Sequence, residues 1–226
     1  MLYLAALFFT TGYSAAATKL EVTQPNIIFV LSDDQAWNGL STRMHPDLAW
    51  SASDFVRTPN IARLAKQGMR FSAAYAPASV CSPTRVSLQT GKSPAQLQWT
   101  KAAPTMTAAN GYKLIPPTIR KHIARDEITI AEMLKTAGYA TAHYGKWHIG
   151  GGGPGLHGYD EHDGDTGNKD AAPHKDPNPV DIFGMSRRAI AFMKKNHAAK
   201  KPFFIQLSYH ALHYSENAME ATKKEY

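Results

Sequence analysis

Two short, nearly continuous runs of apolar, β-favouring residues constrain the fold of this 226-residue chain more than any other feature. Residues 26–31 and residues 203–208 each follow a proline, and each run is followed at once by polar residues. A run without regular polar alternation is typical of a strand buried on both faces, as strands of parallel sheets usually are. We therefore expect a parallel sheet, with residues 26–31 as a central, fully buried strand.

Segments of helical and of strand character alternate between these two runs. Thr58 caps a helix that Gly68 ends, and a capping box from Thr129 to Glu132 begins another helix. Further helices are predicted at residues 83–89 and 185–195, further strands at residues 69–75 and 139–144, and surface loops at residues 98–124 and 151–179. The alternation predicts an α/β fold, with a mostly parallel central sheet and helices on both faces, an α/β/α sandwich.

Residues able to carry chemistry follow the ends of four predicted strands. They are Asp33 and Asp34, then Cys81 by way of a loop, then Lys146 and His148, and finally His210 and His213. In open parallel sheets, ligands bind outside the carboxyl ends of the strands. We therefore expect these side chains to meet at one rim of the sheet.

Cys81 is the only cysteine in the chain, so it forms no intramolecular disulfide. Ser82 is a favourable N-cap and Pro83 a favourable first helical residue, which predicts a helix whose free N–H groups and positive dipole end face Cys81. With Arg85 and Lys92 nearby, the segment describes a pocket for a tetrahedral oxyanion such as sulfate or phosphate. A buried cysteine that fills the core is an equally good interpretation of this segment alone.

The adjacent carboxylates of Asp33 and Asp34 repel each other unless a cation lies between them. Hard ions such as Ca²⁺ or Mg²⁺ take carboxylate oxygens, so the pair suggests a metal site, with a solvated turn as the alternative. The glycine-flanked segment that holds Lys146 and His148 is a weaker signal, because glycines also mark simple turns.

The N-terminal segment differs from the rest of the chain. Residues 2–9 are apolar and residues 14–17 are small, which predicts a signal peptide over residues 1–17 and hence a secreted or periplasmic protein. The apolar stretch is too short for a membrane span, and a buried N-terminal helix is the alternative. Lys and Arg exceed Asp and Glu by seven, which favours anionic ligands weakly. No basic run is interleaved with aromatic residues, so we expect no nucleic acid partner.

Taken together, these segments resemble the sulfatases of the alkaline-phosphatase-like superfamily. The Cys-Ser-Pro-Thr-Arg…Thr-Gly stretch at residues 81–91 resembles their signature, and Gly-Lys-Trp-His at residues 145–148 resembles a second motif. Residues 26–34, 58–68, 129–150 and 202–214 resemble further family segments in the same order. The resemblance implies that residues 18–226 are the N-terminal part of a sulfatase catalytic domain, whose C-terminal part, with the remaining metal ligands and a smaller subdomain, is missing.

The resemblance also implies a mechanism for a sulfuric ester hydrolase. Cys81 would be oxidised by a maturation enzyme to formylglycine, whose hydrate would attack the sulfur of a sulfate ester. Arg85 would stabilise the diol and Lys146 would hold a sulfate oxygen.

The same resemblance assigns the proton transfers and the metal. His148 would assist the proton transfers of the diol, and His213, which we prefer to His210, would protonate the leaving group with Lys146. By similarity Ca²⁺, or Mg²⁺ as the alternative, would be bound by Asp33, Asp34 and the group at position 81.

The expected substrate is a sulfated small molecule or glycan. A phosphonate or phosphate ester hydrolase of the same superfamily and a non-catalytic module that binds sulfated glycans are the alternatives. We expect the chain by itself to be inactive, because it would lack part of the calcium site and would leave one edge of its sheet unpaired.

Overall fold

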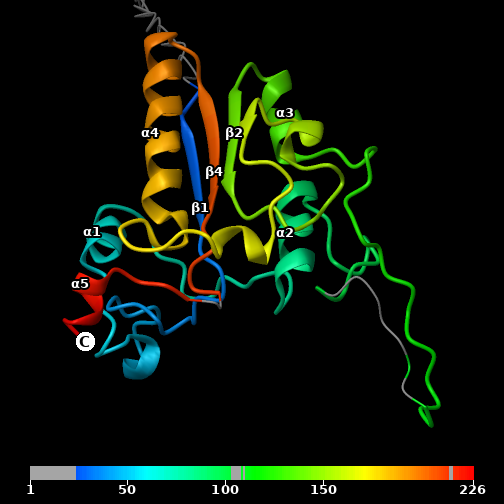
Figure 1. The fold of residues 1–226 in the computed structure, drawn as a ribbon, viewed down its shortest axis with the longest axis horizontal. Helices are drawn as coiled ribbons and strands as arrows, with labels where there is room; N and C mark the ends of the chain where they lie inside the picture. Colours follow the sequence, from blue (N-terminus) through cyan, green and yellow to red (C-terminus); the bar gives the residue numbers. More distant parts are fainter. Residues whose placement is uncertain (1–23, 103–107, 109, 214–215) are drawn as a thin grey trace, which may run out of the picture.

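The computed structural model describes residues 24–102, 108, 110–213 and 216–226. The signal peptide predicted at residues 1–17 lies outside the described residues. The described part of the chain forms a four-stranded sheet with helices packed against it (Figure 1). None of the helices in this part is both long enough and apolar enough to cross a bilayer.

The sheet is parallel throughout, which confirms the predicted fold class. Its strands lie in the order β1 (Ile27–Leu31), β4 (Phe203–Ser208), β2 (Ala140–Gly145) and β3 (Glu161–His162). The α-helices are α1 (Pro59–Gln67), α2 (Cys81–Thr90), α3 (Ile130–Thr136), α4 (Ile182–Ala198) and α5 (Glu220–Lys223). Short 3₁₀-helices span η1 (Ala49–Ser51), η2 (Pro154–His157), η3 (Asn168–Ala171) and η4 (Pro179–Asp181).

The three long strands end at the same level. Leu31 of β1 and Gly145 of β2 are both in register with Ser208 of β4. The segments that follow these strands therefore emerge at one rim of the sheet, as the sequence predicts.

Each face of the sheet carries its own hydrophobic core. On one face α4 packs against β2 and β4, where Met185 and Phe192 join Ile205. On the other face lie α2 and α3, and there Val86 and Trp147 share a core with Phe204. Neighbouring residues of β4 thus enter opposite cores, because side chains alternate along a strand. Helices cover both faces of the sheet, as predicted (Figure 1).

The prediction that residues 26–31 form a central, fully buried strand is wrong in one respect. The strand exists as β1, but it lies at the edge of the described sheet, and Ile28 and Val30 are 49% and 57% exposed. The interior strands are β4 and β2, and all of their residues are buried. An apolar run predicts that a strand packs against a hydrophobic core. It does not predict which strands pair with that strand, or on how many sides.

Two local predictions around Cys81 are corrected by the structure. Residues 69–75 form no strand but an irregular segment whose side chains are exposed, with Met69 at 79% and Phe71 at 66%. Helix α2 begins at Cys81 rather than at Pro83, because the extended backbone of Val80 already forms the N-cap. Ser82 does not cap the helix; its hydroxyl donates to the carbonyl oxygen of His148 at 2.8 Å.

Other local predictions are confirmed. The backbone N–H of Thr129 donates to Glu132 Oε2 at 2.8 Å, and the backbone N–H of Glu132 donates to Thr129 Oγ1 at 3.2 Å, which completes the capping box. The helix predicted at 185–195 lies within α4, and the strand at 203–208 coincides with β4. The loop at 98–124 is irregular where described, although Trp99 and Ile123 reach into a core.

Candidate active site

The first turns of α2 bring Cys81 and Arg85 to the rim of the sheet. The two residues are four apart, so they lie on the same side of the helix. Arg85 is 3% exposed, and its guanidinium donates to the carbonyl oxygen of Lys146 at 2.5 Å. It also lies 3.4 Å from the carboxylate of Asp33. The helix therefore places a thiol and a buried cation next to the ends of β1 and β2.

Lys146 follows β2 directly and is completely buried. Its backbone N–H donates to the carbonyl oxygen of Ser208 at 2.8 Å, which extends the sheet by one bond. Its ammonium pairs with the carboxylate of Asp33 and lies 3.5 Å from the sulfur of Cys81. The preceding residue must be glycine, because a Cβ atom on Gly145, whose φ is +92°, would lie 2.1 Å from Ser208 O.

Asp33 links all of these groups. Its backbone N–H donates to Ala211 O at 2.8 Å, and the N–H of Leu212 donates to Asp33 O at 2.6 Å, so the end of β1 is tied to the segment after β4. Burial acts to raise the pKa of Asp33, but the hydrogen bond from Lys146 and the charges of Arg85 and Lys146 outweigh it. The pKa is therefore below its usual range, and the group is a carboxylate at neutral pH.

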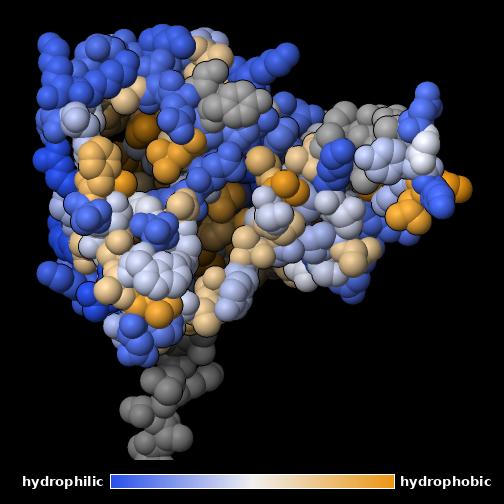
Figure 2. All heavy atoms as spheres, turned by 90° about the horizontal axis from the view of Figure 1, so that it is seen from below, coloured by the Kyte–Doolittle hydropathy of each residue, from blue (hydrophilic) through white to orange (hydrophobic). Residues whose placement is uncertain are grey.

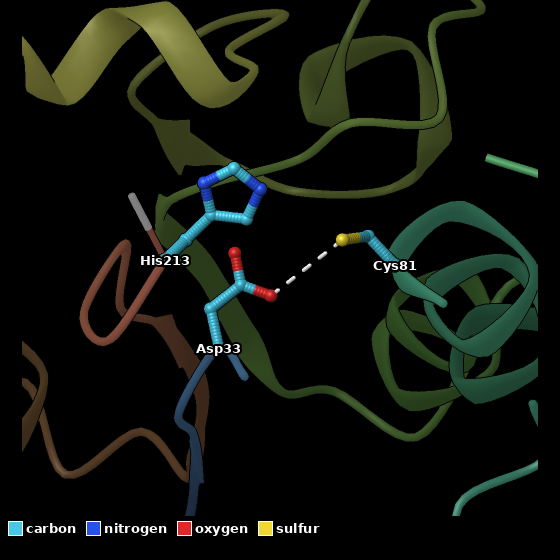
Figure 3. Close-up of side chains that lie close together, drawn as sticks. All are labelled: Asp33, Cys81 and His213. Carbon is cyan, nitrogen blue, oxygen red and sulfur yellow. Dashed lines mark hydrogen bonds between the residues drawn. The ribbon is translucent and has the colours of Figure 1, made fainter. Parts of the chain in front are cut away.

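His213 lies beside Asp33 and Cys81 (Figure 3). One atom of each side chain, either carboxylate oxygen, sulfur or ring nitrogen, lies within 4.8 Å of the other two. The thiol of Cys81 is 3.7 Å from Asp33 Oδ1, the contact drawn as a dashed line in Figure 3. His210 does not belong to this three-residue group, although it lies nearby in the same segment.

His148 and His210 are neutral imidazoles near pH 7. Burial, followed by the positive charges of Lys146 and Arg85, lowers the pKa of each ring to about 4. His148 has a left-handed backbone, with φ of 57°, and its N–H donates to Thr166 O at 2.8 Å. This bond ties the loop after β2 to the segment that leads into η3.

Two of the predicted residues lie elsewhere than the central group. Asp34 is exposed and has a left-handed backbone, with φ of 51°, but it lines a cavity of about 240 Å³ together with Asp33, Cys81 and Arg85. Lys92 lies beyond the other end of α2, where its ammonium pairs with Glu127 at 2.5 Å. The expectation that Lys92 is a cation of the Cys81 pocket is therefore wrong, because Cys81 begins α2 and Lys92 lies beyond its other end.

A second cavity, of about 310 Å³, is also lined by Asp33. It is lined by Asp33, Lys146, His210, His213, Asn168 and Lys169, with two alanines. Asn168 and Lys169 belong to the loop at 151–179, for which the sequence indicated only a solvated surface. No sequence motif marks these two residues. They lie at the cavity because a hydrogen bond from His148 N–H to Thr166 O attaches the segment before η3 to the loop after β2.

A hard metal ion fits part of this donor set. Asp33 and Asp34 line one cavity and offer carboxylate oxygens, which Ca²⁺ and Mg²⁺ prefer. The sulfur of Cys81 and the imidazole of His213 are poor donors for such ions, and an oxygen at position 81 would suit them better. Ca²⁺ takes roughly six to eight oxygen ligands, which is more than these described residues offer.

The fold and the site define an α/β protein whose strand-end rim places buried cations around a single cysteine. The sequence profile described as Sulfatase matches residues 25–226. The chain therefore belongs to the sulfatase family. Arylsulfatase A of Bos taurus is 32% identical over 147 residues, which cover 65% of this chain and 25% of that protein. N-acetylgalactosamine-6-sulfatase of Mus musculus is 31% identical over 220 residues, which cover 84% of this chain and 40% of that protein.

Solved structures show the same likeness. The crystal structure of Ps i-CgsB is 27% identical with a TM-score of 0.64, covering 84% of this chain and 46% of that one. The structure of BT4656, solved in complex with its substrate D-glucosamine-2-N,6-O-disulfate, is 25% identical with a TM-score of 0.60, covering 85% of this chain and 35% of that one. The chain thus spans less than half the length of each of these relatives.

Proposed function

We propose that the protein to which this chain belongs hydrolyses sulfate esters and that the rim around Cys81 is its reaction site. The observation that carries the proposal is the position of Cys81, at the N-terminus of α2, with its sulfur 3.5 Å from the Lys146 ammonium and 3.7 Å from an oxygen of Asp33. Membership of the sulfatase family supports the same reaction.

The electrostatics of the rim suit a sulfate monoester. Arg85 and Lys146 are both paired with the single carboxylate of Asp33, so the buried group carries one net positive charge. The positive end of the α2 dipole points to the same place. A sulfate monoester carries one negative charge, which matches the net charge of these three side chains in the absence of a metal. Buried charges that lack a partner are costly, which favours occupation by an anion.

The proposed nucleophile is the hydrate of formylglycine at position 81. To form the aldehyde, a maturation enzyme would use dioxygen as the oxidant: the β-carbon of Cys81 gives up two electrons, a thiol reductant gives two more, the sulfur leaves as hydrogen sulfide, and one oxygen atom becomes the aldehyde oxygen while the other becomes water. Water then adds to the aldehyde. One hydroxyl of this diol attacks the ester sulfur and the alcohol leaves; the second hydroxyl loses its proton, the carbonyl re-forms and sulfate leaves.

The side chains around position 81 would serve these steps. Lys146, 3.5 Å from the sulfur that the diol replaces, would hold a sulfate oxygen, and Arg85 would stabilise the diol. His148, neutral near pH 7, would accept a proton from the diol. His213, beside both Asp33 and Cys81, would protonate the leaving alcohol together with Lys146.

Calcium is the proposed metal, with Mg²⁺ as the alternative. Asp33, Asp34 and the oxygen that formylglycine would place at position 81 would hold it, and bound there it would withdraw electrons from a sulfate oxygen. Asp33 would then exchange part of its pairing with Lys146 and Arg85 for the metal. Both cations would be released toward the substrate.

The proposed cellular setting is the periplasm or the exterior of the cell. The apolar residues 2–9 and the small residues 14–17 support export, and an exported enzyme meets sulfated glycans of its surroundings. The proposed partners are such a sulfated substrate and the maturation enzyme.

Two measurements test the proposal. The longest form of the protein that the gene encodes is produced together with a formylglycine-generating enzyme. The mass of the tryptic peptide 71–85 is measured by mass spectrometry. In parallel, the rates of turnover of an aryl sulfate and of an aryl phosphonate are compared. We expect the aldehyde at position 81 and faster turnover of the sulfate. Cys81→Ser is the matched control, and we expect it to retain a stable sulfate ester at that position after at most one turnover.

Several results would overturn the proposal. An unmodified thiol in the converting host would point to a non-catalytic module, provided that a co-expressed sulfatase is converted. Preferred turnover of the phosphonate would assign the protein to the other branch of the superfamily. Full turnover by Cys81→Ser would exclude the aldehyde hydrate as the nucleophile.

A further inference from the structure

The cavity of about 310 Å³ beside Asp33 is larger than the reacting sulfate group requires. Cavities of roughly 300 Å³ and above are typical of sites for whole small molecules. Asp33, Lys146 and His213 form its wall toward Cys81, and Asn168, Lys169 and His210 form another part of the lining. Figure 2 shows the molecule from the side at which the strands end, and this face has hollows bordered by both hydrophilic and hydrophobic residues. A ligand there extends past the group that reacts.

Lys169 is exposed, and hydrogen bonds connect the backbone just before it to the reaction site. Thr166 Oγ1 donates to Gly145 O at 2.5 Å and accepts the N–H of Trp147 at 3.0 Å. One residue further, the N–H of Gly167 donates to Asp170 Oδ2 at 2.6 Å and starts η3. The backbone of η3 is therefore fixed to the loop that carries Lys146.

The charge of Lys169 has no counterpart in the cavity lining. Asp33 is the carboxylate of that lining, and it is already paired with Lys146 and Arg85. The nearby carboxylate of Asp170 accepts the bond from Gly167, and the side chain of Lys169 forms no ion pair with a described residue. The cavity therefore carries a positive charge beyond the one that the reacting sulfate would neutralise.

His210 adds an independent sign of a ligand. It is 6% exposed, it lines the same cavity, and its Nδ1 has no hydrogen-bond partner among the described residues. Buried polar atoms in proteins nearly always have a partner. This atom is itself buried, and His210 also lines a neighbouring cavity with Asp163 and Asp170, so a ligand would satisfy it only after the ring turns toward the cavity of Lys169. Its neutral ring offers one donor and one acceptor, which suits a sugar hydroxyl or an oxyanion.

We propose that Lys169 binds a second anionic group of the substrate, so that the substrate is a saccharide with two anionic groups rather than a simple aryl sulfate. The second group is a sulfate or a carboxylate, held between Lys169 and His210 while the first sulfate lies at position 81. The inference rests on the proposed function, because it takes the reacting group at Cys81 to be a sulfate ester. The residues Asn168 and Lys169 then determine substrate specificity and take no part in the reaction.

The test compares two ligands that differ by one anionic group. D-glucosamine-2-N,6-O-disulfate and D-glucosamine-6-O-sulfate are titrated by calorimetry, at low salt, into the longest form of the protein carrying Cys81→Ala, which prevents turnover. Lys169→Gln is compared with Lys175→Gln, a matched control in the same loop that lines neither cavity. We expect Lys169→Gln to weaken binding of the disulfate about tenfold and binding of the monosulfate less than twofold. Lys175→Gln should change neither.

Each other outcome has a definite meaning. Equal weakening of both ligands by Lys169→Gln, or no weakening of the disulfate, would overturn the second subsite while leaving the proposed function intact. Failure of the parent to bind either ligand would contradict the sulfate site itself and the subsite with it. A monosulfated disaccharide with a uronic acid carboxylate forms a further arm: if Lys169→Gln weakens it as it weakens the disulfate, the second group can be a carboxylate.

Discussion

Replacing Asp33 by asparagine is expected to destabilise the fold strongly. The substitution keeps the size of the side chain but removes the carboxylate that pairs with Lys146, whose side chain is 0% exposed, and Arg85, whose side chain is 4% exposed. Two buried cations then remain without a counter-charge. Removing one partner of a buried ion pair typically costs about 3–5 kcal/mol. We expect a loss in the free energy of unfolding within that range.

Urea unfolding followed by tryptophan fluorescence measures this loss, since Trp99 and Trp147 are buried. With a denaturant slope of about 2 kcal/mol per molar, a loss of about 3–5 kcal/mol lowers the midpoint by roughly 1.5–2.5 M. Asp34→Asn is the matched control, because the neighbouring carboxylate is exposed. An exposed substitution of this kind changes stability by about 0.5 kcal/mol at most. Measurements are made in the presence of a chelator, so that metal binding does not contribute.

Added sulfate sharpens the same test. The unpaired cations of Asp33→Asn should bind the anion more tightly than the parent does, so sulfate should recover part of the lost stability, by about 2.7 kcal/mol at one hundred times the dissociation constant. The carboxylate also predicts a pH dependence. Its pKa in the folded chain is below the ordinary 3.8, so its contribution is present above pH 3.8 and is lost as the pH falls through the lower value. Equal stability of Asp33→Asn and Asp34→Asn would refute the reasoning.

Three further substitutions test other parts of the structure by urea unfolding. Gly145→Ala places a Cβ atom 2.1 Å from Ser208 O, on a backbone with φ of +92°. Backbone strain alone costs roughly 1–3 kcal/mol, so we expect the free energy of unfolding to fall by more than that. A stability close to that of the parent would contradict the geometry. Thr129→Ala removes the N-cap and the bond to His157 O at 2.8 Å, and should cost about 2 kcal/mol, with a loss under about 0.5 kcal/mol arguing against it. Burial, followed by the charge of Arg85, lowers the pKa of His143 from 6.5 to about 3, so unfolding takes up a proton and stability falls as the pH falls from 6.5. His143→Gln should reduce this slope near pH 5 by about 1.4 kcal/mol per pH unit, and an unchanged slope would exclude the buried neutral ring.

Local sequence signals determined those elements that depend on neighbouring residues. The Thr129 capping box and the apolar run of β4 were predicted with nearly the observed bounds, because caps and buried strands rely on contacts a few residues apart or on hydrophobicity alone. The same logic failed at residues 69–75, whose alternating apolar residues pair with no strand in the part of the chain that the structure describes. It also failed for Lys92, because Lys92 follows the end of α2 whereas Cys81 lies at its beginning.

The reaction site depends on both levels. The sequence by itself determined that Asp33, Lys146 and the histidines follow strand ends, and parallel strands that end together must bring such residues to one rim. Only the tertiary structure decided that Asp33 pairs with two buried cations from separate elements, and that His213 rather than His210 joins Asp33 and Cys81. It alone placed Lys169 at the same cavity, because one threonine of a loop without any motif attaches η3 to the end of β2. Sequence patterns record which surfaces each segment must bury, whereas long-range pairing decides which segments meet.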